Sequence, residues 1–191
     1  MAVLLALTAI ACTPKERPYT EVIAAHRAEY DDFMRNSTKS PIPQAQRASF
    51  KPINYFPIDE AYRVPASFTP IQSDDYLEMD TSDGAKRRMR RIGKLDFTVK
   101  GQKHALTAFV DAAENDTRRL FVPFGDLTAG TETYPGGRYL DLDRMPSGVY
   151  DLDFNRAYHP YCYYNPEYVC PVPPRENRLQ VPIRAGEKLQ Q

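Results

Sequence analysis

The sequence predicts a mainly β fold of the α+β class, a small antiparallel β-barrel or roll with an N-terminal helix packed on it. First, short runs from residue 75 onward alternate between apolar and polar residues, and turn signals separate the runs. Second, 17 prolines argue against a bundle of long helices, because proline breaks a helix interior. Third, a single stretch, residues 19–36, carries apolar residues at helical spacing.

The length and charge of the chain limit its number of domains and its classes of partner. A chain of 191 residues is long enough to bury one sizeable core and short for two. We find no internal repeat, low-complexity tract or Gly/Ser-rich linker, so we predict a single β-rich domain over residues 19–191. The 25 Lys and Arg residues balance 25 Asp and Glu residues. Without a basic excess, we expect no nucleic-acid partner.

The predicted helix over residues 19–36 has Thr20 in place to act as its N-cap. Its apolar stripe consists of Val22, His26, Tyr30 and Phe33. A short second helix is expected near residues 44–50, after two prolines. Four prolines within residues 51–70 permit only extended or turn backbone there.

The alternating pattern predicts a series of short strands. They cover residues 76–80, 87–92, 95–99, 104–110, 120–124, 139–143 and 149–155, with a last short strand at 179–183. Residues 82–84 read Ser-Asp-Gly, which is a hairpin signal between the first two. A Met-Pro-Ser-Gly turn joins the runs 139–143 and 149–155, so we expect them to form another hairpin.

The N-terminus resembles a bacterial lipoprotein signal. Residues 1–11 are apolar and end in small residues, and Cys12 follows directly. We therefore predict a signal peptide at 1–11, lipid on the Cys12 thiol, and a tether at 12–18. The mature protein would be anchored in the cell envelope, with the periplasmic face favoured. The apolar run is short and no Lys or Arg precedes it, so an ordinary buried N-terminal strand or helix is the alternative.

Acidic residues gather on one face of the predicted 139–155 hairpin. The residues of that face are Tyr139, Asp141, Asp143, Asp151, Asp153 and Asn155. Clustered carboxylates suit a hard cation such as calcium, and they raise one another's pKa, as a general acid requires. The alternative is a solvated acidic face balanced by the arginines of residues 87–91.

The loop Gly125–Arg138 is long and irregular, so it is either a binding loop or a well-ordered connection. Cys162 and Cys170 flank an Asn-Pro turn, and in an exported protein they are expected to form a disulfide. With His159, they could instead bind a metal or supply a nucleophile. Their spacing matches no common zinc arrangement and a free thiol is disfavoured after export, so we predict no metal, cofactor or catalytic residue.

Two C-terminal strings carry a specific resemblance. They are LFVPFGDLTAGTETYPGGRYLDL from residue 120 and DFNRAYHPYCYYNPEYVCPVPPRENRLQVPIRAGEK from residue 153. With the shorter pieces SPIP, NYFPID and TSDG, they resemble the bacterial family known as domain of unknown function 1684. The resemblance covers roughly residues 25–188 and implies exported or lipid-anchored proteins without an established activity. His159 departs from the family's pattern, in which Asn is expected.

The polar motif positions supply the candidate ligand-binding residues. They are Glu132, Arg138, Asp153, Asn155, Arg156, Tyr158, Glu176, Asn177 and Arg184. They either form a buried network that fixes the loops or line a pocket for a small polar ligand. We therefore expect an envelope module that binds a small molecule or another envelope protein. The alternative is a hydrolase or lyase in which Asp153 or Glu176 acts as acid or base beside Arg138 or Arg184.

Overall fold

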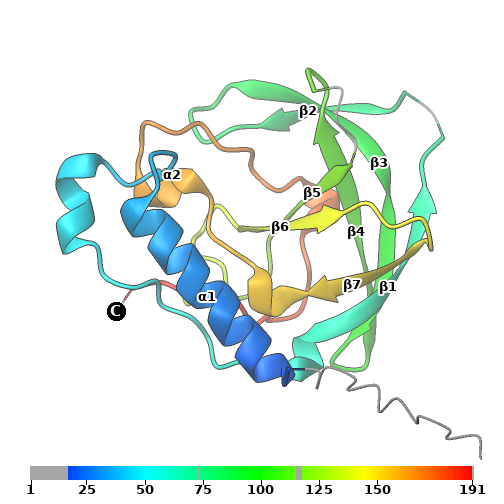
Figure 1. Ribbon diagram of the computed structural model, residues 1–191. Helices are drawn as coiled ribbons and strands as arrows, with labels where there is room; N and C mark the ends of the chain where they lie inside the picture. Colours follow the sequence, from blue (N-terminus) through cyan, green and yellow to red (C-terminus); the bar gives the residue numbers. More distant parts are fainter. Residues whose placement is uncertain (1–16, 73, 115–117, 191) are drawn as a thin grey trace, which may run out of the picture.

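A computed structural model describes residues 17–72, 74–114 and 118–190. The predicted signal peptide, Cys12 and most of the tether lie outside the described residues. Seven antiparallel strands form one sheet that curls into a nearly closed barrel (Figure 1). The strands are β1 (Arg63–Pro70), β2 (Tyr76–Asp80), β3 (Lys86–Val99), β4 (Gln102–Asp111), β5 (Arg119–Phe124), β6 (Arg138–Asp143) and β7 (Val149–Asp153). The predicted mainly β fold is confirmed.

Long strands at the centre of the sheet hold the barrel together. The order is β6-β5-β4-β3-β1-β7, and β2 pairs with β3 off this path. The sequence predicted two strands at 87–92 and 95–99, but both belong to the 14-residue β3. An irregularity in the pairing with β4, between Arg91 and Gly93, lets one strand continue through the break in the pattern. The apolar residues of the barrel interior include Leu95, Leu106, Leu120 and Leu152, all fully buried.

The strands β6 and β7 are the two ends of the sheet path, and the predicted hairpin between them is wrong. Strand β6 pairs with β5, whereas β7 pairs with β1. A segment that follows β7 pairs with the free edge of β6. There the backbones of Tyr139 and Tyr158 exchange hydrogen bonds of 2.9 and 3.1 Å. The barrel therefore has a seam between β6 and β7, and this seam is where the site lies.

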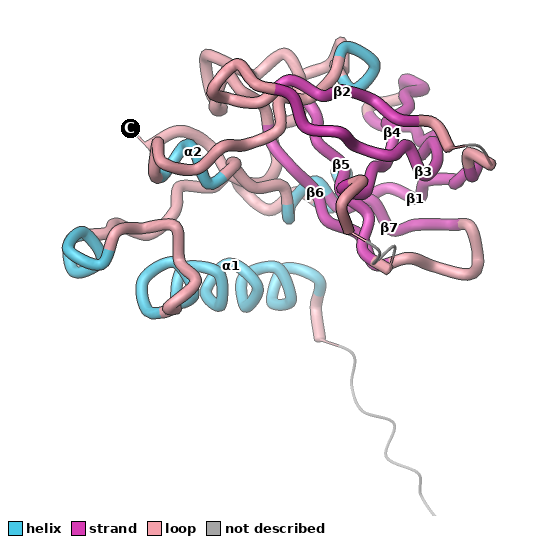
Figure 2. Tube along the Cα trace, turned by 90° about the horizontal axis from the view of Figure 1, so that it is seen from above, coloured by secondary structure: helices cyan, strands magenta, loops and turns pink. Residues whose placement is uncertain are grey.

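Helix α1 (Tyr19–Asn36) confirms the predicted helix and lies outside the barrel, along its β6 and β7 side (Figure 2). Its fully buried residues are Ile23 and Met34. The Tyr19 hydroxyl donates to Asp153 Oδ1 at 2.8 Å and so connects the helix to the end of β7. The expected Thr20 cap is wrong, because the helix begins after Pro18 without a side-chain cap. In the described part of the chain, no helix is both long and apolar enough to cross a membrane.

Short helices and ordered loops complete the structure. They are η1 (Gln44–Ser49), η2 (Glu60–Tyr62), η3 (Phe154–Arg156), α2 (Tyr161–Tyr164) and η4 (Arg175–Asn177). The expected second helix near 44–50 is thus the 3-10 helix η1. The predicted last strand at 179–183 is wrong, because this segment is a loop with bends at Gln180 and Val181 and belongs to no strand of the sheet. Its alternate residues Leu179, Val181 and Ile183 are nevertheless buried against the barrel core.

Candidate functional site

A cleft of about 460 Å³ lies between α1 and the seam. Its aromatic lining consists of Tyr30, Tyr55, Tyr158 and Tyr161. Its acidic lining consists of Asp141, Asp143, Asp151, Asp153 and Glu187. Its remaining polar lining consists of His26, Arg119, Asn155 and Arg156. Residues of α1, of the sheet and of the C-terminal segment all line the cleft, so the cleft exists only in the folded chain.

The aspartates form the rim of the cleft, although the strands that carry them do not pair as the predicted hairpin. Asp141 accepts from Tyr158 Oη at 2.7 Å and pairs with Arg119 at 3.0 Å. Asp151 pairs with Arg63 at 2.7 Å. Asp153 accepts from the Asn155 backbone at 3.0 Å and lies 3.5 Å from Arg156.

The expected balance of these acids by the arginines of residues 87–91 is wrong. In that segment, Arg91 pairs with Asp75 and Glu176, and Arg88 pairs with Glu78. The rim acids take arginines from β1, β5 and η3 instead, because other strands separate β3 from both ends of the sheet path: β4 and β5 on the β6 side, and β1 on the β7 side. Within the described ranges, no three His, Cys, Asp or Glu side chains are grouped to hold a metal ion.

The floor of the cleft is the carboxyl group of Glu187, which is fully buried. Its Oε2 accepts from the Tyr164 hydroxyl at 2.6 Å and from the His159 backbone N–H at 2.7 Å. Its Oε1 has no hydrogen-bond partner among the described residues, and the same is true of the buried Tyr30 hydroxyl. Burial raises the pKa of Glu187 from 4.5 to about 8. At neutral pH the group is therefore largely a neutral acid, with its proton on the free oxygen Oε1.

Glu187 reaches this position because of the residue before it. Gly186 has a φ of +76°, and a Cβ there would lie 2.5 Å from the carbonyl oxygen of Ala157. Only glycine allows this close approach and this backbone conformation. The Glu187 N–H then donates to the same carbonyl at 2.9 Å, and a β-bridge joins Glu187 to Tyr55. The backbone thus fixes the side chain under the seam.

His159 is a fully buried neighbour of Glu187, and its geometry defines its protonation. Its Nε2 accepts from the Tyr134 backbone N–H at 3.3 Å, so the hydrogen of the neutral ring is on Nδ1. Nδ1 lies 3.4 Å from Glu187 Oε2. Burial and the charge of Arg138 lower the pKa of His159 to about 3, so the ring is neutral at physiological pH.

The cysteines are free thiols in the structure, and they lie side by side. The backbone N–H of Cys162 donates to Cys170 Sγ at 3.1 Å. The hydrogen bond from Cys170 lowers the pKa of the Cys162 thiol. The disulfide stays a prediction.

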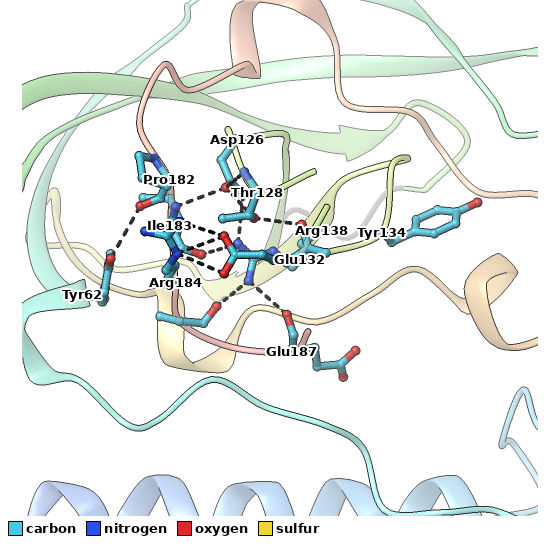
Figure 3. A network of polar contacts seen from close by, with 12 residues as sticks. Tyr62, Asp126, Thr128, Glu132, Tyr134, Arg138, Pro182, Ile183, Arg184 and Glu187 are labelled. Atoms are coloured by element: carbon cyan, nitrogen blue, oxygen red, sulfur yellow. Dashed lines mark hydrogen bonds and ion pairs between the residues drawn. The ribbon is translucent and has the colours of Figure 1, made fainter. Parts of the chain in front are cut away.

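Arg138 lies at the centre of a separate polar network (Figure 3). The guanidinium is fully buried and pairs with Asp126, itself 2% exposed, at 2.9 Å. It also donates to the backbone carbonyls of Ile183, Ala185 and Glu187. Asp126 further accepts from the backbone of Thr128 and Ile183. The loop Gly125–Arg138 is therefore a well-ordered connection whose last residue fastens the C-terminal segment to the barrel.

The structure separates the nine candidate residues predicted from the sequence. Those at the cleft are Asp153, Asn155, Arg156 and Tyr158. Asn177 is buried elsewhere and binds the backbone of Thr107 and Pro123. Arg138 belongs to the network around Asp126. The remaining three form ion pairs nearer the surface, Glu176 with Arg91, and Glu132 with Arg184.

This separation bears on the alternative hydrolase or lyase mechanism. The expected pairs of Asp153 or Glu176 with Arg138 or Arg184 are not formed among the described residues. Each of these four groups is instead bound to a different partner, because the motif positions come from loops at different places on the barrel.

Sequence reasoning missed the floor of the cleft. Glu187 was noticed only within the string RAGEK, and Tyr30 only as part of the α1 stripe. One signal was available, since a glycine followed by an acidic residue comes directly after the alternately apolar segment at 179–185. Arg119 and Tyr55 carried no pattern that distinguished them from other surface or core residues.

Comparison with known proteins identifies the family. The family described as "Protein of unknown function (DUF1684)" matches residues 48–188, and the chain belongs to it. A solution NMR structure of an uncharacterized protein from Haloarcula marismortui is similar, with a TM-score of 0.69 and 38% identity. The alignment covers 88% of this chain and 93% of that one. No protein with a curated description matches the chain.

Proposed function

We propose that this member of the family binds a small polar molecule in the cleft between α1 and the β6–β7 seam. One observation carries the proposal: Glu187 is a fully buried lining residue of the cleft, and its Oε1 has no hydrogen-bond partner among the described residues. A buried polar atom left unpaired costs roughly 1–3 kcal/mol, and a ligand that hydrogen-bonds to it would remove that cost.

The walls of the cleft support the same conclusion. Ligand pockets are usually concave, rich in aromatic side chains, and supplied with a few convergent polar groups. Here the tyrosines give the apolar surface, while Glu187 and Tyr30 give two buried polar atoms that need partners. In Figure 3 the Glu187 carboxyl group extends away from the Arg138 guanidinium, so it does not belong to that network.

Ligand binding should stabilise the fold, because the cleft joins α1 to the barrel. A ligand present at one hundred times its Kd would add about 2.7 kcal/mol to the free energy of unfolding. The test is a thermal-shift screen of polar metabolites against the wild-type protein and the variant Glu187→Gln. We expect at least one compound to raise the Tm of the wild type and to have a much smaller effect on the variant.

The matched control is Glu176→Gln, which makes the same chemical change at a surface carboxylate paired with Arg91. It should respond to the compound as the wild type does. The proposal fails if no compound raises the Tm, or if the compounds that do so act equally on Glu187→Gln.

We also propose that the chain is exported and lipid-anchored through Cys12. The apolar run at 1–11, the small residue before Cys12 and the Pro-bounded stretch after it support this proposal. Intact-mass analysis after bacterial expression should show a chain that begins at Cys12 and carries acyl groups. A Cys12→Ala variant should lose them. An unmodified chain that begins at Met1 would contradict the proposal.

A further inference from the structure

We infer that the ligand of this cleft is a small organic cation, an ammonium or a guanidinium compound, held by Glu187 and Tyr30 beneath a rim of aspartates. The inference rests on the proposed function and names the chemical class of its ligand. Three properties of the cleft lead to it: the charge of the rim, the aromatic walls, and the two unpartnered polar atoms of the floor.

The rim is acidic overall. Four aspartates line the cleft with two arginines, Arg119 and Arg156, and a third arginine, Arg63, pairs with Asp151 from outside the lining, which leaves a formal excess of one negative charge before Glu187 is counted. His26 also faces the cleft, and burial lowers its pKa, so it adds little positive charge near neutral pH. A cation is attracted to such a rim, whereas a carboxylate or phosphate is repelled.

The aromatic walls suit the same ligand. Cations bind over the faces of tyrosine rings, and clusters of such rings are the usual site for organic ammonium groups. Tyr55 already shows this behaviour, since the guanidinium carbon of Arg27 lies 4.4 Å from its ring centre. Tyr30 and Tyr158 lie next to each other on the cleft, with ring centroids 6.3 Å apart.

The floor offers acceptors for N–H donors. Glu187 Oε1 and the Tyr30 hydroxyl oxygen are both buried, and both lack partners in the described ranges. On binding, Glu187 releases its proton to solvent, and the carboxylate that remains pairs with the cation. The positive charge that the site gains from the ligand is thus compensated by the proton that it loses.

Several other groups influence the titration of Glu187. The charged and titratable groups that face Glu187 are Tyr30 and Asp31 on α1, Tyr55, Arg138 on β6, His159, and Tyr161 and Tyr164 on α2. Arg138 is already paired with Asp126, and His159 is neutral above about pH 3. Near neutral pH, Glu187 is therefore the group whose proton a bound cation displaces.

The experiment measures affinity against pH with defined probes. The cations are ethanolamine, putrescine and agmatine; the neutral probe is glycerol; the anion is acetate. We expect only cations to bind, with an affinity that rises up to tenfold per pH unit between about pH 6 and 8 and then levels off. Glu187→Gln should weaken binding by at least about tenfold and abolish the pH dependence.

A second variant keeps the test decisive if Glu187→Gln folds poorly. Tyr30→Phe removes only a hydroxyl group, so it should weaken cation binding but leave the pH dependence intact. Glu176→Gln should change neither. The inference would be overturned if glycerol, acetate or another uncharged or anionic compound from the metabolite screen bound in a way that depends on Glu187. The proposed binding function would still stand in that case. Cation binding that is independent of both pH and Glu187 would also overturn it, and a lack of any ligand would overturn both proposals.

Discussion

Two buried polar side chains, Arg138 on β6 and Glu187 in the C-terminal segment, lie near each other in the structure. They differ in whether the protein supplies all of their main hydrogen-bond partners. Both terminal nitrogens of Arg138 bind atoms of the protein: Asp126 and three backbone carbonyls. The backbone carbonyl of Glu187 is one of those acceptors, but its carboxyl group points away from Arg138, lines the cleft, and leaves Oε1 without a partner among the described residues. Burial of a charged residue therefore marks a structural connection in one region and a candidate binding site in the other.

The difference shows how to interpret a cluster of polar residues. Groups whose hydrogen bonds end within the protein fix its shape, and removing one leaves its partners unsatisfied. Groups that keep a free atom on a cavity are available to a ligand, and they can change protonation when it binds.

Replacing Arg138 should have the largest effect on stability. Arg138→Met leaves Asp126 buried without its cation, and breaking a buried pair in this way typically costs about 3–5 kcal/mol. Urea unfolding should show a loss of that size. A loss below about 1 kcal/mol would mean that the network does not hold the C-terminal segment, and that Arg138 has some other role.

Replacing Asn177 should have the next largest effect. Asn177→Ala removes three hydrogen bonds of 2.7–2.9 Å to the backbone of Thr107 and Pro123, and leaves these buried groups unsatisfied. We expect a loss of about 2–3 kcal/mol in the free energy of unfolding. The neighbouring Glu176→Ala is the matched control and should change it by less than about 1 kcal/mol. Equal effects at both positions would contradict the division between buried and surface partners.

The pH dependence of stability should come from Glu187 and His159, with opposite signs. The folded state binds more protons at Glu187 than the unfolded state between pH 4.5 and about 8, so this group lowers stability as pH rises, by up to about 1.4 kcal/mol per unit. The folded state binds fewer protons at His159 between about pH 3 and 6.5, so stability rises there. We expect a maximum near pH 5–6, measured by Tm across pH.

Glu187→Gln should remove the alkaline decline without changing the acid side. Glu176→Gln should leave both sides as they are. An unchanged alkaline decline in Glu187→Gln would show that another group titrates there.

The smallest effect is expected at the exposed pair beside the network. Arg184 contacts Glu132 through Nε at 2.9 and 3.0 Å and through Nη2 at 2.9 Å, but its side chain is 56% exposed. Exposed pairs contribute little to stability, because solvent screens the charges and the paired side chains lose conformational freedom. Arg184→Ala should therefore shift urea unfolding only slightly. A loss as large as that of Arg138→Met would show that charge, rather than burial, determines the contribution.

The fold was predictable from the sequence to the extent that local pattern determines it. Helix α1 and the strands β2, β4, β5 and β6 lie close to where periodicity placed them, because alternation and helical spacing reflect which face is buried. The errors concern pairing. The 139–155 hairpin failed because strand edges outside the local sequence, at β1 and β5, took both strands. The predicted strand at 179–183 failed because a loop segment with the right alternation packs on the core without joining the sheet.

The candidate site shows the same limit. Asp153, Asn155, Arg156 and Tyr158 are consecutive or nearly so in the chain, so one motif places them together. Glu187, Tyr30 and Tyr55 reach the cleft from segments more than 20 residues apart, and their residue types alone do not set them apart from surface or core positions. Arg138 and Asn177 looked like binding residues because they are polar motif positions. Only their hydrogen-bond partners show that they serve the fold.

By itself, the sequence determined the mainly β class, the N-terminal helix, the acidic character of residues 139–155 and membership of a family of unknown function. Tertiary structure alone decided that β6 and β7 face each other across a seam, that α1 covers this seam, and that Glu187 forms its floor. The physical reason is that periodicity indicates which side of a segment is buried, whereas long-range packing determines which other segments lie against that side. Whether a buried carboxyl oxygen lacks a hydrogen-bond partner depends on every segment that packs around it.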